Sequence, residues 1–226
     1  MELLRYRDLL THCRTFEYKR RIKMNYYIAD CHFGHTKALE FDHRPFADTQ
    51  EMEEAMVANW NATVKPGDIV YILGDFCMGH ADEWLRIIRR LTGNKMLIQG
   101  NHDLKQYPPE LRKQFADIKD YKEVKDYLNG ERRTVYLSHY PIMFYKHCKH
   151  ESCYMLCGHV HISPENDLLE KWTAELKTAR MDPDSHIVNR AQIYNVGCMM
   201  PWMAYTPRTL DEIVQGHDAY MAKNEE

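Results

Sequence analysis

The stretch Tyr26-Tyr27-Ile28-Ala29-Asp30-Cys31-His32 shows the pattern around which the whole chain is organised. An apolar run long enough for a β-strand ends in two polar residues, Asp30 and His32, of the kind that bind metal ions. Their ligand-x-ligand spacing lets two alternate side chains at a strand end or tight turn reach one ion. We therefore interpret this stretch as a strand that presents metal ligands at its carboxyl end.

Four more apolar runs of strand length, each followed by polar residues of the same kind, occur further along the chain. They are Ile69 to Leu73 before Gly74-Asp75, Met96 to Ile98 before Gly100-Asn101-His102-Asp103, Val135 to Leu137 before His139, and Tyr154 to Leu156 before Gly158-His159-Val160-His161. Open α/β sheets build their sites outside the carboxyl ends of the strands. We therefore expect the five polar segments to meet along one edge of a sheet.

Together these segments carry more ligands than one zinc ion takes, since zinc is held by roughly three or four. The set is Asp30, His32, Asp75, Asn101, His102, His139, His159 and His161. It suits two ions that share a carboxylate and lie roughly 3.5–4 Å apart. A mixture of imidazole, carboxylate and amide donors favours Mn, Fe, Zn or Co over Mg and Ca, which prefer oxygen ligands.

The order Asp-x-His, Gly-Asp, Gly-Asn-His-Asp, His and Gly-His-x-His resembles the calcineurin-like metallophosphoesterases, also called the purple-acid-phosphatase-like superfamily. The resemblance extends from about Tyr26 to Val196, and all five motifs are present in order. It implies an α/β fold, a four-layer α/β/β/α sandwich in which two mixed β-sheets are flanked by helices. Phe76-Cys77-Met78-Gly79 departs from the Asp-Arg-Gly run of the Ser/Thr protein phosphatases, which argues against that subgroup.

The resemblance also implies a role for each residue of the set. Asp30, His32 and His161 would bind the first metal, Asn101, His139 and His159 the second, and Asp75 would bridge the two. His102 would be the histidine that binds no metal and lies beside the scissile phosphate, acting in catalysis together with Asp75. The implied cofactors are two divalent ions, Mn²⁺ or Fe or Zn, with Mn²⁺ favoured in vitro. Hydroxide bridging them would attack phosphorus directly, without a covalent enzyme intermediate.

Two residues after the first motif are candidates for substrate binding. His35 follows His32 closely, and it would contact the substrate or support a metal ligand from behind. Arg44 lies in the loop Phe41-Asp42-His43-Arg44-Pro45-Phe46, where its guanidinium offers a bidentate fork to a phosphate. The alternative is that this segment is a surface loop fixed by its proline and its second phenylalanine.

The remaining pattern predicts one domain over residues 24–226. The full chain of 226 residues is long enough for a large α/β domain with a sizeable core, and no linker divides it. Apolar spacing predicts helices over 49–63, 81–91, 164–181 and 210–221, and Asn129-Gly130 predicts a hairpin turn. Residues 1–23 form a basic extension that we expect to be dispensable; the alternative is an amphipathic segment that packs on the domain or on a partner.

The composition limits the partners of the protein. A formal net charge of −3 provides no overall positive field to attract nucleic acid. No apolar segment approaches the roughly 18 residues that a membrane span requires, and the N-terminal residues lack the apolar core of a signal peptide. Seven cysteines, an odd number, do not suggest a secreted disulfide framework. We therefore expect a soluble, cytoplasmic protein with no membrane partner.

Three functions remain open from the sequence. We favour a phosphoesterase that hydrolyses a small phosphate mono- or diester, such as a nucleotide, because no capping domain or basic groove is evident. A nuclease of the same superfamily is the second, and its affinity for nucleic acid would fall steeply with salt. The third is a non-catalytic metal-binding interaction module on the same fold, against which the complete ligand set argues.

Overall fold

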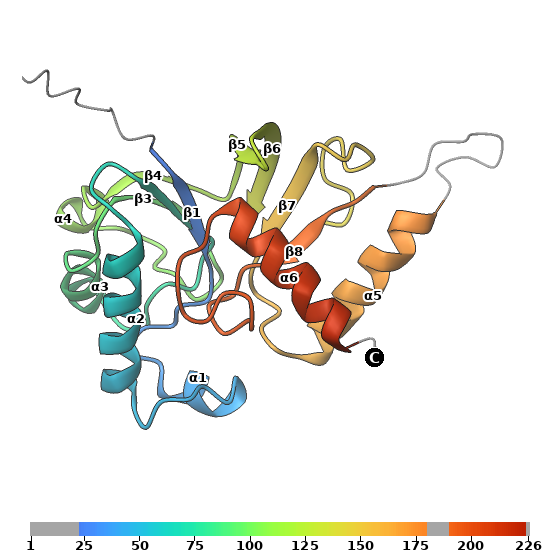
Figure 1. Cartoon of the computed structure of the whole chain (residues 1–226). Helices are drawn as coiled ribbons and strands as arrows, with labels where there is room; N and C mark the ends of the chain where they lie inside the picture. Colours follow the sequence, from blue (N-terminus) through green and yellow to red (C-terminus); the bar gives the residue numbers. More distant parts are fainter. Residues whose placement is uncertain (1–22, 180–189, 225–226) are drawn as a thin grey trace, which may run out of the picture.

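The computed structural model describes residues 23–179 and 190–224, which build two four-stranded sheets and the helices around them (Figure 1). The first sheet has the order β1 (Asn25–Ile28), β2 (Ile69–Ile72), β3 (Asn94–Ile98) and β4 (Phe115–Lys119). The second has the order β5 (Tyr121–Leu128), β6 (Glu131–Ser138), β7 (Cys153–Cys157) and β8 (Ile193–Asn195). All neighbours in the first sheet are parallel, whereas β5 is antiparallel to β6 and the others of the second sheet are parallel.

Helices accompany the two sheets in the described part of the chain. They are α1 (Thr36–Phe41), α2 (Thr49–Thr63), α3 (Ala81–Ile88), α4 (Pro109–Arg112), α5 (Pro164–Thr178) and α6 (Leu210–Asn224). In Figure 1, α2, α3 and α4 lie on the side of the first sheet, and α5 lies beyond the second. Helix α6 contacts β1, β5 and β8, so it joins the two sheets. The α/β/β/α arrangement is the predicted one. Only the second sheet is mixed as predicted, because every pair of strands in the first is parallel.

The strands β6 and β7 explain why the second half of the chain shows continuous apolar runs. Their residues alternate between two cores, because side chains along a strand point to opposite faces. Val135, Leu137, Tyr154 and Leu156 join the core shared with the first sheet, whereas Tyr136, Met155 and Cys157 pack in a second cluster with Leu169 of α5. Both faces are therefore buried at β7 and at the carboxyl half of β6, and these residues show no alternation of polar and apolar types.

The predicted elements are largely confirmed. Helix α2 has the predicted bounds, and the Asp48 side chain caps it by accepting a hydrogen bond from the Glu51 backbone N–H. The hairpin turn is confirmed, with positive φ at both Asn129 and Gly130. Helix α3 ends at Ile88, before the predicted end at residue 91. The short α1 and the strand β4 were not predicted, because segments of this length carry little periodic signal.

One sequence-based expectation concerns a segment that is almost entirely outside the described residues. The segment 1–23 lies outside the described residues except for Lys23, so the expectation that it is dispensable stays a prediction. Among the helices that the structure describes, none has both the length and the hydropathy that crossing a membrane requires.

Candidate metal centre

The five polar segments follow the carboxyl ends of β1, β2, β3, β6 and β7. Strands β1, β2 and β3 are parallel in the first sheet, and β6 and β7 are parallel in the second, so their carboxyl ends gather within each sheet. Contacts of Asn101 after β3 with His139 after β6 and His159 after β7 bring the two sets of ends together. The side chains of the segments meet there in two groups. The first group is Asp30, His32, Asp75 and His161, and the second is Asn101, His139 and His159.

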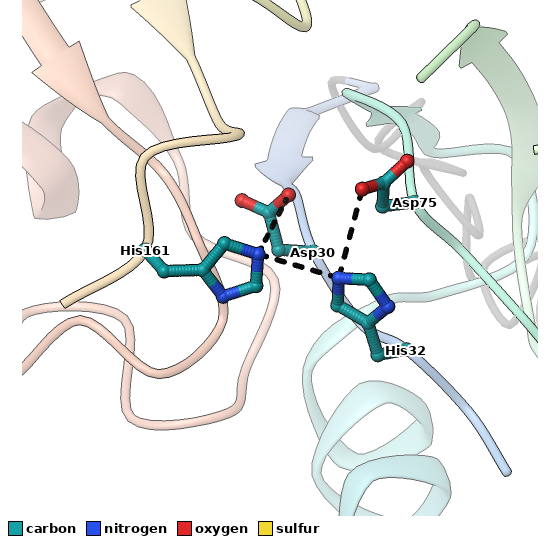
Figure 2. Close-up of side chains that lie close together, drawn as sticks. All are labelled: Asp30, His32, Asp75 and His161. Atoms are coloured by element: carbon teal, nitrogen blue, oxygen red, sulfur yellow. Dashed lines mark hydrogen bonds and ion pairs between the residues drawn. The ribbon is translucent and has the colours of Figure 1, made fainter. Parts of the chain in front are cut away.

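The first group gathers four metal-type ligands around one point. One ligand atom from each residue lies within 4.8 Å of all the others, and Figure 2 shows the four side chains directed toward one another. His32 Nε2 is 3.3 Å from His161 Nε2 and 3.6 Å from Asp75 Oδ2. His161 Nε2 is in turn 3.9 Å from Asp30 Oδ1. Two imidazoles and two carboxylates in this arrangement are a donor set that fits a divalent transition metal.

The second group is centred on the side-chain oxygen of Asn101. This Oδ1 atom is 2.8 Å from His139 Nε2 and 2.9 Å from His159 Nδ1. The other nitrogen of His139, Nδ1, is 2.8 Å from the backbone oxygen of Leu73 and donates its proton to that carbonyl. Such a hydrogen bond fixes the tautomer, so the lone pair on Nε2 faces Asn101 and is available to a metal.

Asp75 of the first group also reaches the second. Its Oδ2 atom is 3.6 Å from His32 Nε2 and 3.6 Å from His139 Nε2, and the side chain is 2% exposed. Its Oδ1 atom accepts a hydrogen bond of 2.9 Å from the backbone N–H of His102. One carboxylate oxygen therefore faces a histidine of each group, the position in which a carboxylate can serve two ions.

His102 belongs to neither group. Its side chain is exposed, its ring centroid is 5.8 Å from that of His32 in a T-shaped contact, and it borders the same cavity as the ligands. This position leaves the imidazole free to meet a bound substrate.

The backbone at the site is strained. Five residues of the two groups have positive φ: Asp30 (52°), His32 (48°), Asp75 (50°), His159 (73°) and His161 (48°). This conformation costs a non-glycine residue roughly 1–2 kcal/mol. Strain of this kind persists where the surrounding structure enforces it, and it concentrates at functional sites. Nothing in the sequence pattern predicted it.

Glycines allow the ligand loops to approach one another closely. A Cβ atom on Gly158 would lie 2.5 Å from Asp30 Oδ2, and one on Gly74, which has a φ of 83°, would lie 2.5 Å from His139 Nδ1. A side chain at either position would displace a candidate ligand. The glycine that opens each of these segments is therefore part of the geometry of the site.

Burial keeps most of the histidines neutral. It lowers the pKa of His32 to about 2, and it also lowers the pKa of His139 and of His159. A neutral imidazole is the form that binds metal. Burial raises the pKa of Asp30 to about 7, although the nearby His161 works in the opposite direction. A divalent ion beside this carboxyl would restore its charged form.

Asp42 is a residue of the site that the sequence did not reveal, and it changes the interpretation of Arg44. The Asp42 carboxylate lies 3.0 Å from His161 Nδ1 and accepts hydrogen bonds from Arg44 Nε and Nη2 at 3.0 and 2.7 Å. Arg44 Nη1 and Nη2 also donate to the backbone oxygens of Cys31 and Asp30 at 2.8 and 2.9 Å. The predicted substrate-binding role of Arg44 is thus corrected to a structural one, because its guanidinium is buried and saturated by protein acceptors.

Two further side chains, His35 and Asp103, contact candidate ligands or the backbone next to them. His35 Nδ1 is 3.3 Å from His32 Nδ1, the ring nitrogen that points away from Asp75. Asp103 is buried and accepts hydrogen bonds from the backbone N–H groups of Phe76 and Gly100 at 2.9 and 2.7 Å. His35 is therefore placed against the candidate ligand His32, whereas a contact with substrate stays a prediction.

A cavity of about 410 Å³ opens onto the ligands. Residues of both groups line it, together with His102 and the apolar side chains Phe41, Val160 and Ile162. The candidate ligands of both groups are therefore open to a small molecule that enters this cavity.

Comparison with known proteins identifies the family of the chain. The model of the family described as calcineurin-like phosphoesterases matches residues 26–219, so the chain belongs to this family. It is 38% identical to the uncharacterized protein MJ1445 of Methanocaldococcus jannaschii over 80 residues, which are 34% of this chain and 46% of that protein. It is 30% identical to the Gene 66 protein of Mycobacterium phage D29 over 129 residues, 51% of this chain and 63% of that protein.

A solved structure shares the fold. The crystal structure of a protein of unknown function from Aquifex aeolicus, AQ665, superposes with a TM-score of 0.59 at 27% sequence identity. The match covers 86% of this chain and 99% of that one. The two curated relatives, in contrast, are matched over less than two thirds of their own length.

Proposed function

We propose that the protein hydrolyses a small, nucleotide-like phosphate mono- or diester with two divalent metal ions, of which Mn²⁺ suits the donor set. The observation that carries the proposal is the position of Asp75 Oδ2, 3.6 Å from a histidine nitrogen of each ligand group. Membership of the calcineurin-like phosphoesterases supports the reaction type.

Some residues of the site would hold the ions, and His102 would act on the substrate. Asp30, His32 and His161 would hold one ion, Asn101, His139 and His159 the other, and Asp75 both. When bound, such a pair of ions offsets the charge of the phosphate and supplies a deprotonated water as nucleophile.

The exposed imidazole of His102 would interact with the substrate directly. It borders the cavity without joining the ligand groups, and its backbone N–H is anchored on Asp75. From there it would donate a proton to the leaving oxygen or a hydrogen bond to a phosphoryl oxygen. Losing this group would reduce turnover while both ions stay bound.

The cavity favours a small substrate over nucleic acid. Its volume of about 410 Å³ is within the usual range for small-molecule sites. Among the described residues that line it there is no Lys or Arg. Nucleases draw much of their affinity from basic side chains that neutralise successive phosphates, and the described lining of this cavity contains none. The non-catalytic alternative is disfavoured by the strained backbone that brings a complete ligand set together.

The proposal is tested with metal-free protein reloaded with Mn²⁺ and two chromogenic substrates, p-nitrophenyl phosphate and bis-p-nitrophenyl phosphate. Hydrolysis of either that requires Mn²⁺, and that falls strongly in His102→Ala at full metal content, would support it. The faster substrate would identify a monoesterase or a diesterase. No hydrolysis of either substrate by protein with two bound ions would turn the balance toward the non-catalytic alternative.

A further inference from the structure

We propose that Phe41, Val160 and Ile162 form an apolar wall that receives a planar aromatic group attached to the phosphate of the substrate. This inference rests on the proposed function, which places the phosphate at the ligand groups. The three side chains come from two segments, the end of α1 and the loop after β7, and they line one cavity with the candidate ligands.

The wall is unusual in being apolar and open to solvent beside a polar site. Phe41 is 46% exposed and Ile162 is 49% exposed, although both are large hydrophobic residues. Single exposed apolar residues are common on protein surfaces and need no explanation. Here, however, Val160 also lines the same cavity, so the apolar side chains gather where a substrate would enter.

The ring of Phe41 is held in place by the imidazoles of the site. It makes edge-to-face contacts with His161 at a centroid distance of 5.1 Å and with His35 at 5.8 Å. A third such contact, with His32, has a centroid distance of 6.2 Å and an interplanar angle of 87°. These distances are typical of favourable aromatic pairs. The ring is thus fixed relative to the ligands while a large part of it remains available for stacking.

The charges around the cavity indicate what the aromatic group carries. The described lining contains no Lys or Arg, and Glu165 stands at its rim with its carboxylate accepting a 2.7 Å hydrogen bond from the Ser163 hydroxyl. That hydrogen bond lowers the pKa of Glu165, so the rim is negatively charged. A chain of further phosphates would be repelled there, whereas a neutral ring with hydrogen-bond donors would be accepted. The wall therefore favours an ester of one phosphate and one planar ring.

Phosphonates test the wall without depending on turnover, because their C–P bond is not hydrolysed. Isothermal titration calorimetry of Mn²⁺-loaded protein would compare methylphosphonate, phenylphosphonate and cyclohexylphosphonate. We expect phenylphosphonate to bind roughly tenfold more tightly than methylphosphonate, the usual gain from one aromatic stacking contact. Cyclohexylphosphonate, which is of similar size but not planar, is expected to fall between them.

Two variants assign the preference to the wall. Phe41→Leu keeps an apolar side chain against His161 but removes the aromatic face, so the advantage of phenyl over cyclohexyl should disappear. Phe41→Ala should also remove most of the advantage over methyl. The matched control is Phe144→Ala, because Phe144 is 73% exposed and lines a separate groove beside Trp172. This control should keep the wild-type preference.

The outcomes separate the wall from the proposed function. If methylphosphonate binds the metal-loaded protein but phenylphosphonate binds no tighter, the wall is refuted and the proposed function stands. Equal binding of phenyl and cyclohexyl compounds, or an unchanged preference in Phe41→Leu, also refutes it. If methylphosphonate does not bind protein that holds both ions, the proposed function fails and the inference fails with it.

Discussion

Replacing Asp42 by Asn is expected to weaken metal binding although Asp42 is not itself a ligand. Its carboxylate lies 3.0 Å from His161 Nδ1 and pairs with the Arg44 guanidinium, and both side chains of the pair are fully buried. Asn has nearly the same shape but no charge. Arg44 therefore loses its counter-ion, and the single amide oxygen of Asn can accept from Arg44 or from His161 but no longer from both, which weakens the contact that fixes the tautomer of His161.

The substitution is expected to lower both the affinity for the metal and the stability of the fold, by different amounts that are measured separately. Loss of the partner behind a metal-binding histidine typically reduces metal affinity about 10- to 100-fold, which is about 1.4–2.8 kcal/mol of binding free energy. Breaking a buried ion pair by removing one charge costs about 3–5 kcal/mol of folding stability. For Asp42→Asn we expect a loss of folding stability at the lower end of this range. The Asn carbonyl still accepts a hydrogen bond, and Arg44 keeps its bonds to the backbone of Cys31 and Asp30.

Calorimetric titration with Mn²⁺ and urea unfolding of the metal-free protein measure the two costs separately. The control is Asp68→Asn, because Asp68 is buried at the amino-terminal end of β2 and accepts backbone hydrogen bonds from Met24 and Lys65 at 3.1 and 2.9 Å. It should lose stability without losing Mn²⁺ affinity. An Asp42→Asn protein that is less stable but binds Mn²⁺ as tightly as wild type would refute the positioning role.

Three other predictions follow from single contacts. Gly158→Ala should abolish Mn²⁺ binding in the same titration, because its Cβ would lie 2.5 Å from Asp30 Oδ2; full binding would show that the loop adjusts. His161→Gly and His161→Ala should both lose the metal, but in urea unfolding the Gly variant should be more stable by about 1 kcal/mol, since residue 161 has a φ of 48°. The third concerns His217 of α6, which is 3.1 Å from Glu170 of α5. Burial alone would lower the pKa of His217, but the hydrogen bond to Glu170 raises it above 6.5, so this contact stabilises the fold below pH 6.5 and less as the pH rises through the raised value. The stability difference between wild type and His217→Gln should therefore shrink by about 1 kcal/mol across that rise, and a difference independent of pH would contradict it.

The sequence predicted the candidate ligands better than the residues and backbone angles that hold them in place. Residues such as Asn101 and His139 follow apolar runs, and parallel strands place such positions at one edge of each sheet. Convergence within each sheet therefore follows from the topology, whereas the meeting of the two sheets' segments depends on how the sheets pack. The order of the motifs added the family, which the match over residues 26–219 confirms.

The surroundings of the ligands did not follow from local patterns. Asp42 and Arg44 lie in a loop, where no periodicity indicates which way a side chain points, and Arg44 turned inward to meet backbone oxygens. The positive φ angles of residues such as Asp75 depend on contacts between segments far apart in the chain. Tertiary packing decides both features, so they are visible only once the strands are assembled.

The most direct test of the proposed dinuclear site is the stoichiometry and magnetic coupling of bound Mn²⁺ in wild type, Asp75→Ala and His102→Ala. We predict two ions per chain in wild type, with an electron paramagnetic resonance spectrum of a coupled pair, because ions sharing a carboxylate lie roughly 3.5–4 Å apart. His102→Ala should keep both ions, and Asp75→Ala should lose both. A single ion in wild type, or two ions retained by Asp75→Ala, would contradict a site built around Asp75.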